Sequence, residues 1–344
     1  MTHRVAAIDC GTNSIRLLIA DITPDSGNEQ RDTERRHGAT ETAQSPPLMD
    51  VTRQMRIVRL GEGVDRTGRL SPAALDRTMA ALSEYAALIA EARPEAVRMV
   101  ATSATRDAAN SQEFTDRVRA ILGVAPEVIS GDDEAWLSFT GATRELAGTP
   151  LATAGMCPPP YLVTDIGGGS TEFILGAPGE AAPGVPHGQL SGRSVNIGCV
   201  RMTERHLHAN PPLPGEIAAT TKDIDAALEL VAETVPAEKA RTLVGLAGSV
   251  TTVAAIALGL GEYDSIRIHH SRISAARVHE IAGELLAMTR AERAAIPVMH
   301  PGRVDVIGAG ALILDRIMSR FGFAEVLVSE HDILDGIAWS QVKA

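Results

Sequence analysis

The stretch LVTDIGGGSTEFIL, residues 162–175, places three consecutive glycines and a Ser-Thr-Glu between two short apolar runs. Apolar runs of this length are typical of buried strands, and a glycine cluster between them indicates a tight turn. The segment is therefore predicted to be a β-hairpin. Because glycine has no Cβ, the backbone N–H groups of its turn are open to a ligand.

A second copy of this pattern lies 156 residues earlier, in VAAIDCGTNSIRLLIA, residues 5–20. In the alignment Asp9 falls on Asp165, Gly11 on Gly167 and Ser14 on Ser170. Both copies have the order apolar strand, Asp-x-Gly-x-x-Ser turn, apolar strand. The chain is thus predicted to consist of two related halves, each opening with the same hairpin.

Strand and helix patterns alternate along the rest of the chain, which predicts an α/β fold. Ser71 and Pro72 form an N-cap and first-turn pair for a helix to about residue 92. Further helices are predicted at 132–147, 216–235, 274–290, 304–321 and 333–342, and strands at 97–104, 125–130 and 324–330. The polar segment 22–51 is predicted to be a mobile loop between hairpin strands, and 177–192 a second such insert in the equivalent place after the second copy. We place the domains at 1–130 and 131–344, with the last helix packing back on the first.

Composition excludes several classes of protein. Of the 344 residues 44% are hydrophobic and 22% are charged, and the net charge is −11. With 3% aromatic residues, neither a nucleic-acid surface nor a base-stacking platform is expected. The three cysteines have no metal-ligand spacing, and the N-terminus is not a signal peptide, so a cytoplasmic protein is expected. Residues 243–261 carry no charge, but their glycines and hydroxyls favour a buried strand, glycine turn and core helix over a membrane span.

The glycine turn has several possible uses. A nest of backbone N–H groups binds phosphate oxygens. A Walker loop is excluded because no Gly-Lys-Ser/Thr follows, and a dinucleotide fold is disfavoured because a strand rather than a helix follows. A purely structural turn is the alternative for a single glycine cluster. Two facing hairpins with an aspartate before each turn, Asp9 and Asp165, would instead clamp a phosphate chain and a metal ion between the halves.

These motifs resemble the exopolyphosphatase and guanosine pentaphosphate phosphohydrolase (Ppx/GppA) family. The matching stretches are AIDCGTNSIRLLIA, LGEGVDRTGRLS, VATSATRDAAN, ISGDDEA, DIGGGSTE, GCVRMTE, GLAGSVTT and RVDVIGAGALIL. The resemblance implies two actin-like domains with a cleft between them, as in the sugar kinase, Hsp70 and actin superfamily. It further implies the short, two-domain form of the family.

The resemblance also implies a site and a reaction. Glu134 falls on the glutamate that activates the attacking water, and Glu172 and Asp165 fall on further catalytic-site acids. Asp165, Asp9 and Glu172 are the predicted ligands of Mg²⁺ or another divalent cation. The predicted substrate-binding residues are Gly11, Thr12, Asn13, Ser14, Arg106, Gly167, Gly168, Gly169, Ser170 and Thr171. Without the resemblance, Glu134 is a common first-turn acid, and Arg106 could equally pair with Asp107 or Glu113 on the surface.

The expected activity is removal of terminal phosphate from inorganic polyphosphate, with guanosine pentaphosphate as the alternative substrate. Regulation by alarmone nucleotides, a role in the stringent response and a homodimer are left open. Asp332 and Leu334 stand where many family members have Gly and Arg, which leaves the chain-length preference open. A sugar kinase and a non-catalytic nucleotide sensor are less favoured. Cys10 and Arg16 fit the Cys-x5-Arg pattern of cysteine phosphatases, but a strand rather than a helix follows them.

Overall fold

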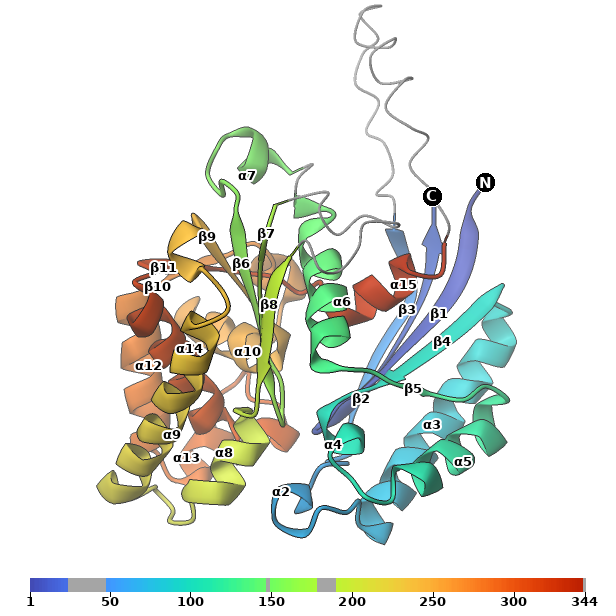
Figure 1. The fold of residues 1–344 in the computed structure, drawn as a ribbon, viewed down its shortest axis with the longest axis horizontal. Coiled ribbons are helices and arrows are strands. Elements are labelled where there is room, and N and C mark those ends of the chain that lie inside the picture. Colours follow the sequence, from blue (N-terminus) through green and yellow to red (C-terminus); the bar gives the residue numbers. More distant parts are fainter. Residues whose placement is uncertain (24–47, 147–148, 178–189, 343–344) are drawn as a thin grey trace, which may run out of the picture.

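The computed structural model describes residues 1–23, 48–146, 149–177 and 190–342. These residues form two α/β halves that lie side by side, each built on one mixed sheet (Figure 1). The predicted α/β class is confirmed.

The first sheet has the strand order β3-β2-β1-β4-β5. Its strands are β1 (His3–Cys10), β2 (Ser14–Ile22), β3 (Leu48–Ile57), β4 (Ala96–Ala101) and β5 (Glu127–Val128). β1, β2 and β3 form an antiparallel meander, while β4 runs parallel to β1 and β5 parallel to β4. The predicted first hairpin is therefore the pair β1 and β2.

The second sheet has the order β10-β11-β9-β6-β7-β8. Its strands are β6 (Tyr161–Ile166), β7 (Thr171–Gly176), β8 (Ser191–Val195), β9 (Thr242–Leu246), β10 (Arg272–Ser274) and β11 (Glu325–Val328). Again a meander, β6, β7 and β8, is followed by strands parallel to its first member, and β10 is an added edge strand. The repeat seen in the sequence is thus a repeat of topology.

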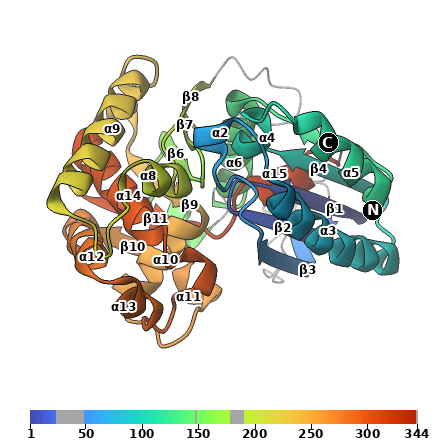
Figure 2. The same cartoon turned by 90° about the horizontal axis from the view of Figure 1, so that it is seen from below.

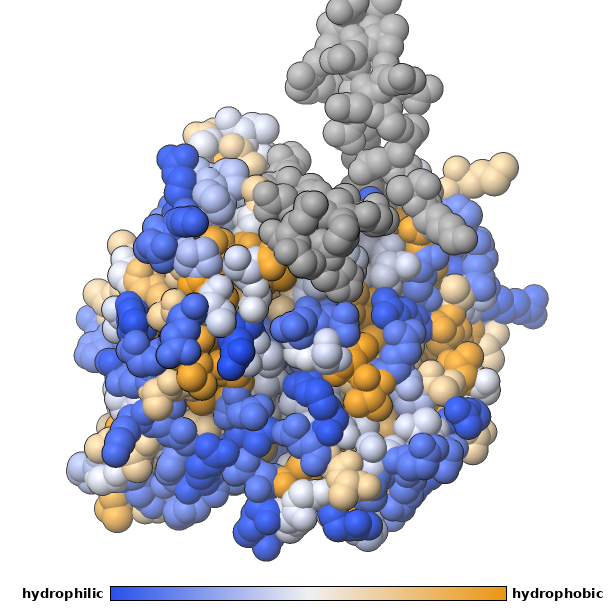
Figure 3. Space-filling model, in the orientation of Figure 1, coloured by the Kyte–Doolittle hydropathy of each residue, from blue (hydrophilic) through white to orange (hydrophobic). Residues whose placement is uncertain are grey.

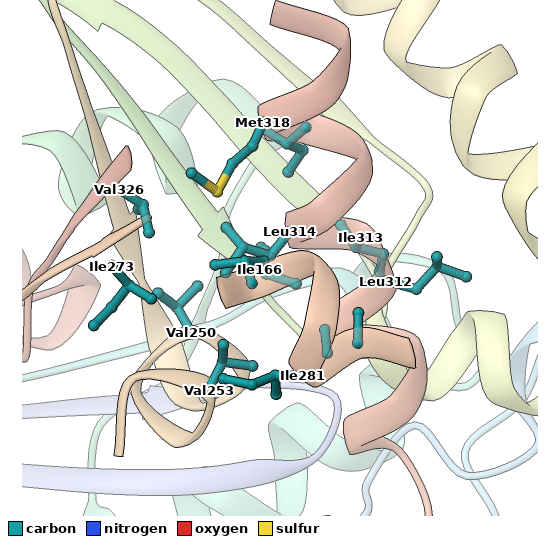
Figure 4. Close-up of a cluster of buried hydrophobic side chains, with 14 of the residues drawn as sticks. Ile166, Val250, Val253, Ile273, Ile281, Leu312, Ile313, Leu314, Met318 and Val326 are labelled. Atoms are coloured by element: carbon teal, nitrogen blue, oxygen red, sulfur yellow. The ribbon is translucent and has the colours of Figure 1, made fainter. Parts of the chain in front are cut away.

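Helices cover the outer face of each sheet. In the first half, α3 (Pro72–Ala92) and α5 (Ser111–Leu122) pack on one face of the sheet through Tyr85, Phe114 and neighbouring apolar residues. In the second half, α9 (Pro214–Ala232), α10 (Ala247–Ala257), α12 (Ala275–Ala287) and α14 (Ile307–Phe321) share the largest core cluster. Figure 4 shows part of this cluster, in which Val250 and Val253 of α10 lie in the same core as Leu314 of α14 and Ile166 of β6.

Shorter helices connect these elements. They are α2 (Val64–Thr67), α4 (Ser103–Arg106), α7 (Pro150–Thr153), α8 (Cys199–His206), α11 (Ser265–Ile268) and α13 (Arg290–Ala294), with 3-10 turns η3 (Ala237–Lys239) and η4 (Pro301–Arg303). No helix in the described ranges is long and apolar enough to cross a membrane. Hydrophilic side chains cover much of the face in Figure 3, and hydrophobic ones form small separate patches.

Two helices lie between the sheets, α6 (Gly131–Thr143) and α15 (Ile333–Trp339) (Figures 1 and 2). α15 follows the last strand of the second sheet but packs on β1 and β2 of the first. α6 packs on both sheets and on α15. The two helices cross closely, since a Cβ on Gly141 would lie 1.8 Å from the Asp332 carbonyl oxygen and one on Gly336 2.0 Å from that of Leu137.

The predicted loops were partly wrong. Residues 24–47 and 178–189 lie outside the described residues, but β3 begins at Leu48 and β8 at Ser191, so the ends of both predicted loops are strands. Both are edge strands, and β3 is exposed or half-buried along nearly all of its length, so neither shows an apolar pattern. The strand and core helix predicted in 243–261 are confirmed. The left-handed residue at their junction is Ala247, with φ of 68°, rather than a glycine.

Candidate functional site

The turns of the two hairpins touch each other. A Cβ on Gly168 would lie 2.9 Å from Thr12 Cβ and 3.3 Å from Asn13 N. A Cβ on Gly169 would lie 2.5 Å from Ser103 Oγ. None of the three consecutive glycines has a positive φ, so their value is close approach rather than an unusual backbone conformation. Part of the room that the glycines provide is filled by the opposite hairpin.

A cavity lies where the hairpins meet, and it gathers most of the predicted site. Of the predicted residues, those lining it are Asp9, Gly11, Thr12, Asn13, Ser14, Glu134, Asp165, Gly167, Gly168 and Ser170. Arg106, Glu172, Gly169 and Thr171 do not line it directly. Arg106 and Glu172 adjoin it through side-chain partners, whereas the Thr171 hydroxyl donates to the Ile197 carbonyl oxygen at 2.5 Å and is buried in the fold.

Glu134 projects from the first turn of α6. Ser130 caps this helix and forms a capping box with Asp133, which fixes the helix start. Glu134 is buried, and Arg106 Nη1 donates to its Oε2 at 3.1 Å and to the Ile129 carbonyl oxygen at 3.0 Å. Burial, and then the negative charge of Glu172, raise the pKa of Glu134 well above its usual value, while Arg106 opposes the shift. A carboxylate in this setting is a stronger base than one in water.

Arg106 was expected to face the phosphate cleft or to form a surface ion pair. Its partner is Glu134, and Asp107 pairs instead with Arg201 at 2.5 Å. Arg106 therefore acts on the cavity through Glu134, and its direct contact with phosphate stays a prediction.

Asp165 and Glu172 face each other as a cross-strand pair of β6 and β7. Ser138 Oγ donates to Asp165 Oδ2 at 2.8 Å, and Ser194 Oγ donates to Glu172 Oε1 at 2.7 Å. Burial, followed by the charge of Asp332, raises the pKa of Asp165 to about 6. Burial, followed by the charge of Asp165, raises the pKa of Glu172 to about 7. The site thus concentrates carboxylates that share few cations.

Arg16 lies at the equivalent position of the first hairpin and points into the cavity. Its Nη2 and Nε both donate to Asp9 Oδ2, at 2.6 and 3.0 Å, and its Nη1 donates to Asp332 Oδ2. The sequence had left the direction of Arg16 open. Asp332, noted only as a departure from the family, proves to be a partner of this central arginine.

A divalent cation would find oxygen ligands here, although no group of three metal-ligand side chains gathers among the described residues. Asp9 Oδ1 is buried and has no hydrogen-bond partner within the described part of the chain. Mg²⁺ commonly binds one or two carboxylates and completes its shell with water and substrate phosphates. Asp9 and Asp165 fit that pattern. The three-carboxylate set predicted with Glu172 is not preformed, and its metal-binding role stays a prediction.

Sequence reasoning missed several residues of the cavity. They are Thr102, Ser103, Cys199, Ala247, Gly248, Ser249 and Arg303. The Arg303 guanidinium lies against Gly248, because a Cβ added to Gly248 would be 2.2 Å from Arg303 Nη2. Arg303 Nη1 donates to Thr252 Oγ1 at 3.1 Å. The stretches GLAGSVTT and RVDVIGAG contain both residues, so the signal was present in the family motifs. The left-handed backbone conformation of Ala247, beside Gly248, could not be predicted from its residue type.

Cys10 does not have the environment of a nucleophile. It is buried on β1, and burial, followed by the charge of Asp9, raises the pKa of its thiol. The turn after it leads into strand β2, so no helix N-terminus stabilises a thiolate. The geometry therefore disfavours the cysteine-phosphatase alternative.

Two mixed sheets of the same topology, with hairpins that meet at an acid-lined cavity, define an actin-like protein. The chain belongs to the Ppx/GppA phosphatase family, whose model matches residues 39–344. It is 46% identical to "Exopolyphosphatase 2" of Mycobacterium tuberculosis over 98% of each chain. It is 27% identical to a guanosine-5'-triphosphate,3'-diphosphate pyrophosphatase of Aeromonas salmonicida, covering 97% of this chain and 58% of that protein.

Solved structures agree with this placement. An exopolyphosphatase-like protein matches with a TM-score of 0.85 and 40% identity over 99% of this chain and 98% of that one. The Ppx/GppA enzyme of Aquifex aeolicus matches with a TM-score of 0.72 and 28% identity over 99% and 100% of the two chains. The family resemblance and the actin-like fold expected from the sequence are confirmed.

Proposed function

We propose that this protein is an exopolyphosphatase, which hydrolyses the terminal phosphoanhydride bond of inorganic polyphosphate. The observation that carries the proposal is the placement of Glu134, a buried carboxylate held by Arg106 at the wall of the cavity where the two hairpins meet. The full-length similarity to a protein named as an exopolyphosphatase supports the substrate. This setting suits hydrolysis, because a base beside an anion-binding turn can take a proton from water that attacks phosphorus.

The residues have distinct roles in this proposal. The backbone N–H groups inside the two turns, at residues 12–13 and 168–169, hold the terminal phosphate oxygens. Gly11 N and Gly167 N close the turns by donating to the carbonyl oxygens of Ser14 and Ser170. Glu134 orients the water molecule and accepts its proton as the bond to phosphorus forms. Arg106 holds the carboxylate of Glu134 in place and stabilises its ionised form. The bridging oxygen leaves with the shortened chain, and inorganic phosphate is released.

Asp9 and Asp165 would hold Mg²⁺ or another divalent cation together with the substrate. When bound, the cation neutralises phosphate charge and stabilises charge that develops in the transition state. Such help is needed here, because the cavity contains Asp9, Asp165 and Glu134, and the arginines bonded to Asp9 and Glu134, Arg16 and Arg106, are already neutralised by these carboxylates. We place the reaction in the cytoplasm, as the cysteine usage suggests.

Guanosine pentaphosphate is the alternative substrate, favoured by the similarity to the Aeromonas enzyme. The test is phosphate release from tripolyphosphate, long-chain polyphosphate and guanosine pentaphosphate in Mg²⁺ without ATP. An exopolyphosphatase releases phosphate from inorganic chains. Release from the nucleotide alone would favour the alternative, a kinase would need ATP and an acceptor, and a nucleotide sensor would release nothing.

A further inference from the structure

A second cavity lies beside the catalytic cavity. Arg16, Ala247, Gly248 and Arg303 line both, so these residues form the neck between them. The second cavity has a volume of about 450 Å³ and the first about 90 Å³. The hairpins would hold one end of a phosphate chain. A chain that is too long for the first cavity would extend through this neck into the second.

Asp332 stands at the neck on the side of the second cavity and is held firmly. Its Oδ2 accepts from Arg16 Nη1 and its Oδ1 accepts from Leu334 N at 3.0 Å. Its backbone N donates to Asp335 Oδ2 at 2.9 Å, and its carbonyl lies against Gly141. Because the residue is buried and N-caps α15, its carboxylate cannot turn away from a ligand without breaking several contacts.

The charges around the neck do not favour a polyanion. Arg16 is shared between Asp9 and Asp332, so little of its charge is left for phosphate. Arg53, which lines the second cavity, is paired with Asp50 at 2.7 Å and Asp335 at 2.6 Å. Arg303 donates to the neutral Thr252 and lies within electrostatic reach of Glu330. Among the described residues, a phosphate that passes the neck therefore meets the Arg303 guanidinium and the fixed carboxylate of Asp332.

The rest of the second cavity adds no cationic partner for an inorganic chain among its described lining residues. Its wall combines Pro297, Val298, Met299 and Leu334, which offer no hydrogen bond from a side chain, with neutral polar groups such as Gln54 and Thr251. Burial, followed by the charge of Arg303, lowers the pKa of His300 and so favours its neutral form. Glu330 adds a further acidic group, bonded to Tyr263 at 2.6 Å. Phosphates beyond the neck would therefore gain few charged contacts.

We propose that Asp332 is a specificity-determining residue that limits bound polyphosphate to short chains, by fixing a negative charge where the catalytic cavity adjoins the second one. This inference rests on the proposed function. Asp332 forms a salt bridge with Arg16 and repels the internal phosphates of a longer chain. The terminal phosphates held by the hairpins lie in the catalytic cavity, before the neck.

The test compares wild type with Asp332→Asn, which keeps the shape of the side chain and can still cap α15. Affinity for tripolyphosphate and for a long-chain polyphosphate fraction is measured by calorimetry, and turnover is measured separately. We expect affinity for the long chain to rise about tenfold in the variant, because a like charge has been removed. Affinity for tripolyphosphate should change less than about twofold, because Arg16 stays paired with Asp9. Asp332→Ser, another good N-cap, serves if the amide variant is unstable.

Asp225→Asn is the matched control. Asp225 pairs with Arg316 at 2.8 Å and lines neither cavity, so the variant has the same change in net charge and should have wild-type affinity for both chains. Equal changes for short and long chains in Asp332→Asn, or none, would overturn the inference. If the predicted shift in affinity is seen without phosphate release from either chain, the inference holds and the proposed function fails. Absence of binding to all forms would overturn both.

Discussion

Arg16 and Glu172 occupy equivalent positions in the two copies of the hairpin, each directly across from an aspartate, Asp9 for Arg16 and Asp165 for Glu172. In the first copy the pair is a salt bridge. In the second it consists of two carboxylates, and each charge raises the pKa of a neighbour. Equivalent positions of the two hairpins thus carry a cationic side chain that lines the cavity, Arg16, and a carboxylate that adjoins it, Glu172.

The coupling between the carboxylates predicts a change in pH dependence. The negative charge of Glu172 raises the pKa of Glu134, so Glu172→Gln should lower that pKa and move the acid limb of the kcat profile to lower pH. Arg106 stabilises ionised Glu134, so Arg106→Gln should move the same limb to higher pH. Steady-state rates between pH 5 and 9 in the presence of Mg²⁺ would measure both shifts. Profiles that coincide with that of wild type would rule out Glu134 as the titrating base.

The close contact between the two hairpin turns predicts the effect of adding a side chain at Gly168. Gly168→Val would push against Thr12 and Asn13 of the other hairpin, so the two halves of the site should separate and kcat/KM should fall on the order of 10²-fold. Melting temperature should fall less, because the backbone of Gly168 is not left-handed.

Gly123→Val is the control, since Gly123 has φ of 73° and open space around it. There the strain is confined to the backbone, so stability should fall by about 1–2 kcal/mol while the rate of folded protein is kept. A Gly168→Val protein that loses stability but keeps its rate would mean that the glycines only form a turn.

The crossing of α6 and α15 predicts a stability effect. Gly141→Ala places a methyl group against the backbone of Asp332, and the required shift should lower the free energy of unfolding by about 3 kcal/mol. Because α6 carries Glu134, kcat should fall as well. Gly283→Ala, in an exposed turn of α12 with nothing within 4 Å of the added methyl, should stabilise by ~0.5–1 kcal/mol. Denaturant unfolding would measure both, and equal stability of the two variants would contradict the close crossing.

Chelation tests the need for a cation. Excess EDTA should reduce phosphate release at least about tenfold, and added Mg²⁺ should restore it, because a chain of phosphates and a cavity of carboxylates repel each other. Asp9→Asn should raise the Mg²⁺ concentration needed for half-maximal activity. Undiminished release in EDTA would exclude the cation from the mechanism.

The fold could be predicted largely because the repeated Asp-x-Gly hairpin is local in sequence. The helices that begin with strong capping residues, such as Ser71 for α3, were also predicted closely. The edge strands β3 and β8 were missed because exposed strands need no apolar pattern. Within the site, the type of residue could be predicted but not its partner. The pairing of Arg16 with Asp332 joins positions 316 residues apart, and only tertiary structure brings them together.

In the proposed reaction Glu134 activates the water that attacks the terminal phosphate. The most direct measurement is phosphate release from polyphosphate by Glu134→Gln, beside Asp132→Asn, which neutralises an exposed acid of the same helical turn. We expect Glu134→Gln to lower kcat on the order of 10²-fold or more, with polyphosphate affinity and melting temperature retained, and Asp132→Asn to keep the wild-type rate. A near-normal kcat in Glu134→Gln would contradict this role of Glu134 and would leave Asp133 or Glu172 as the base.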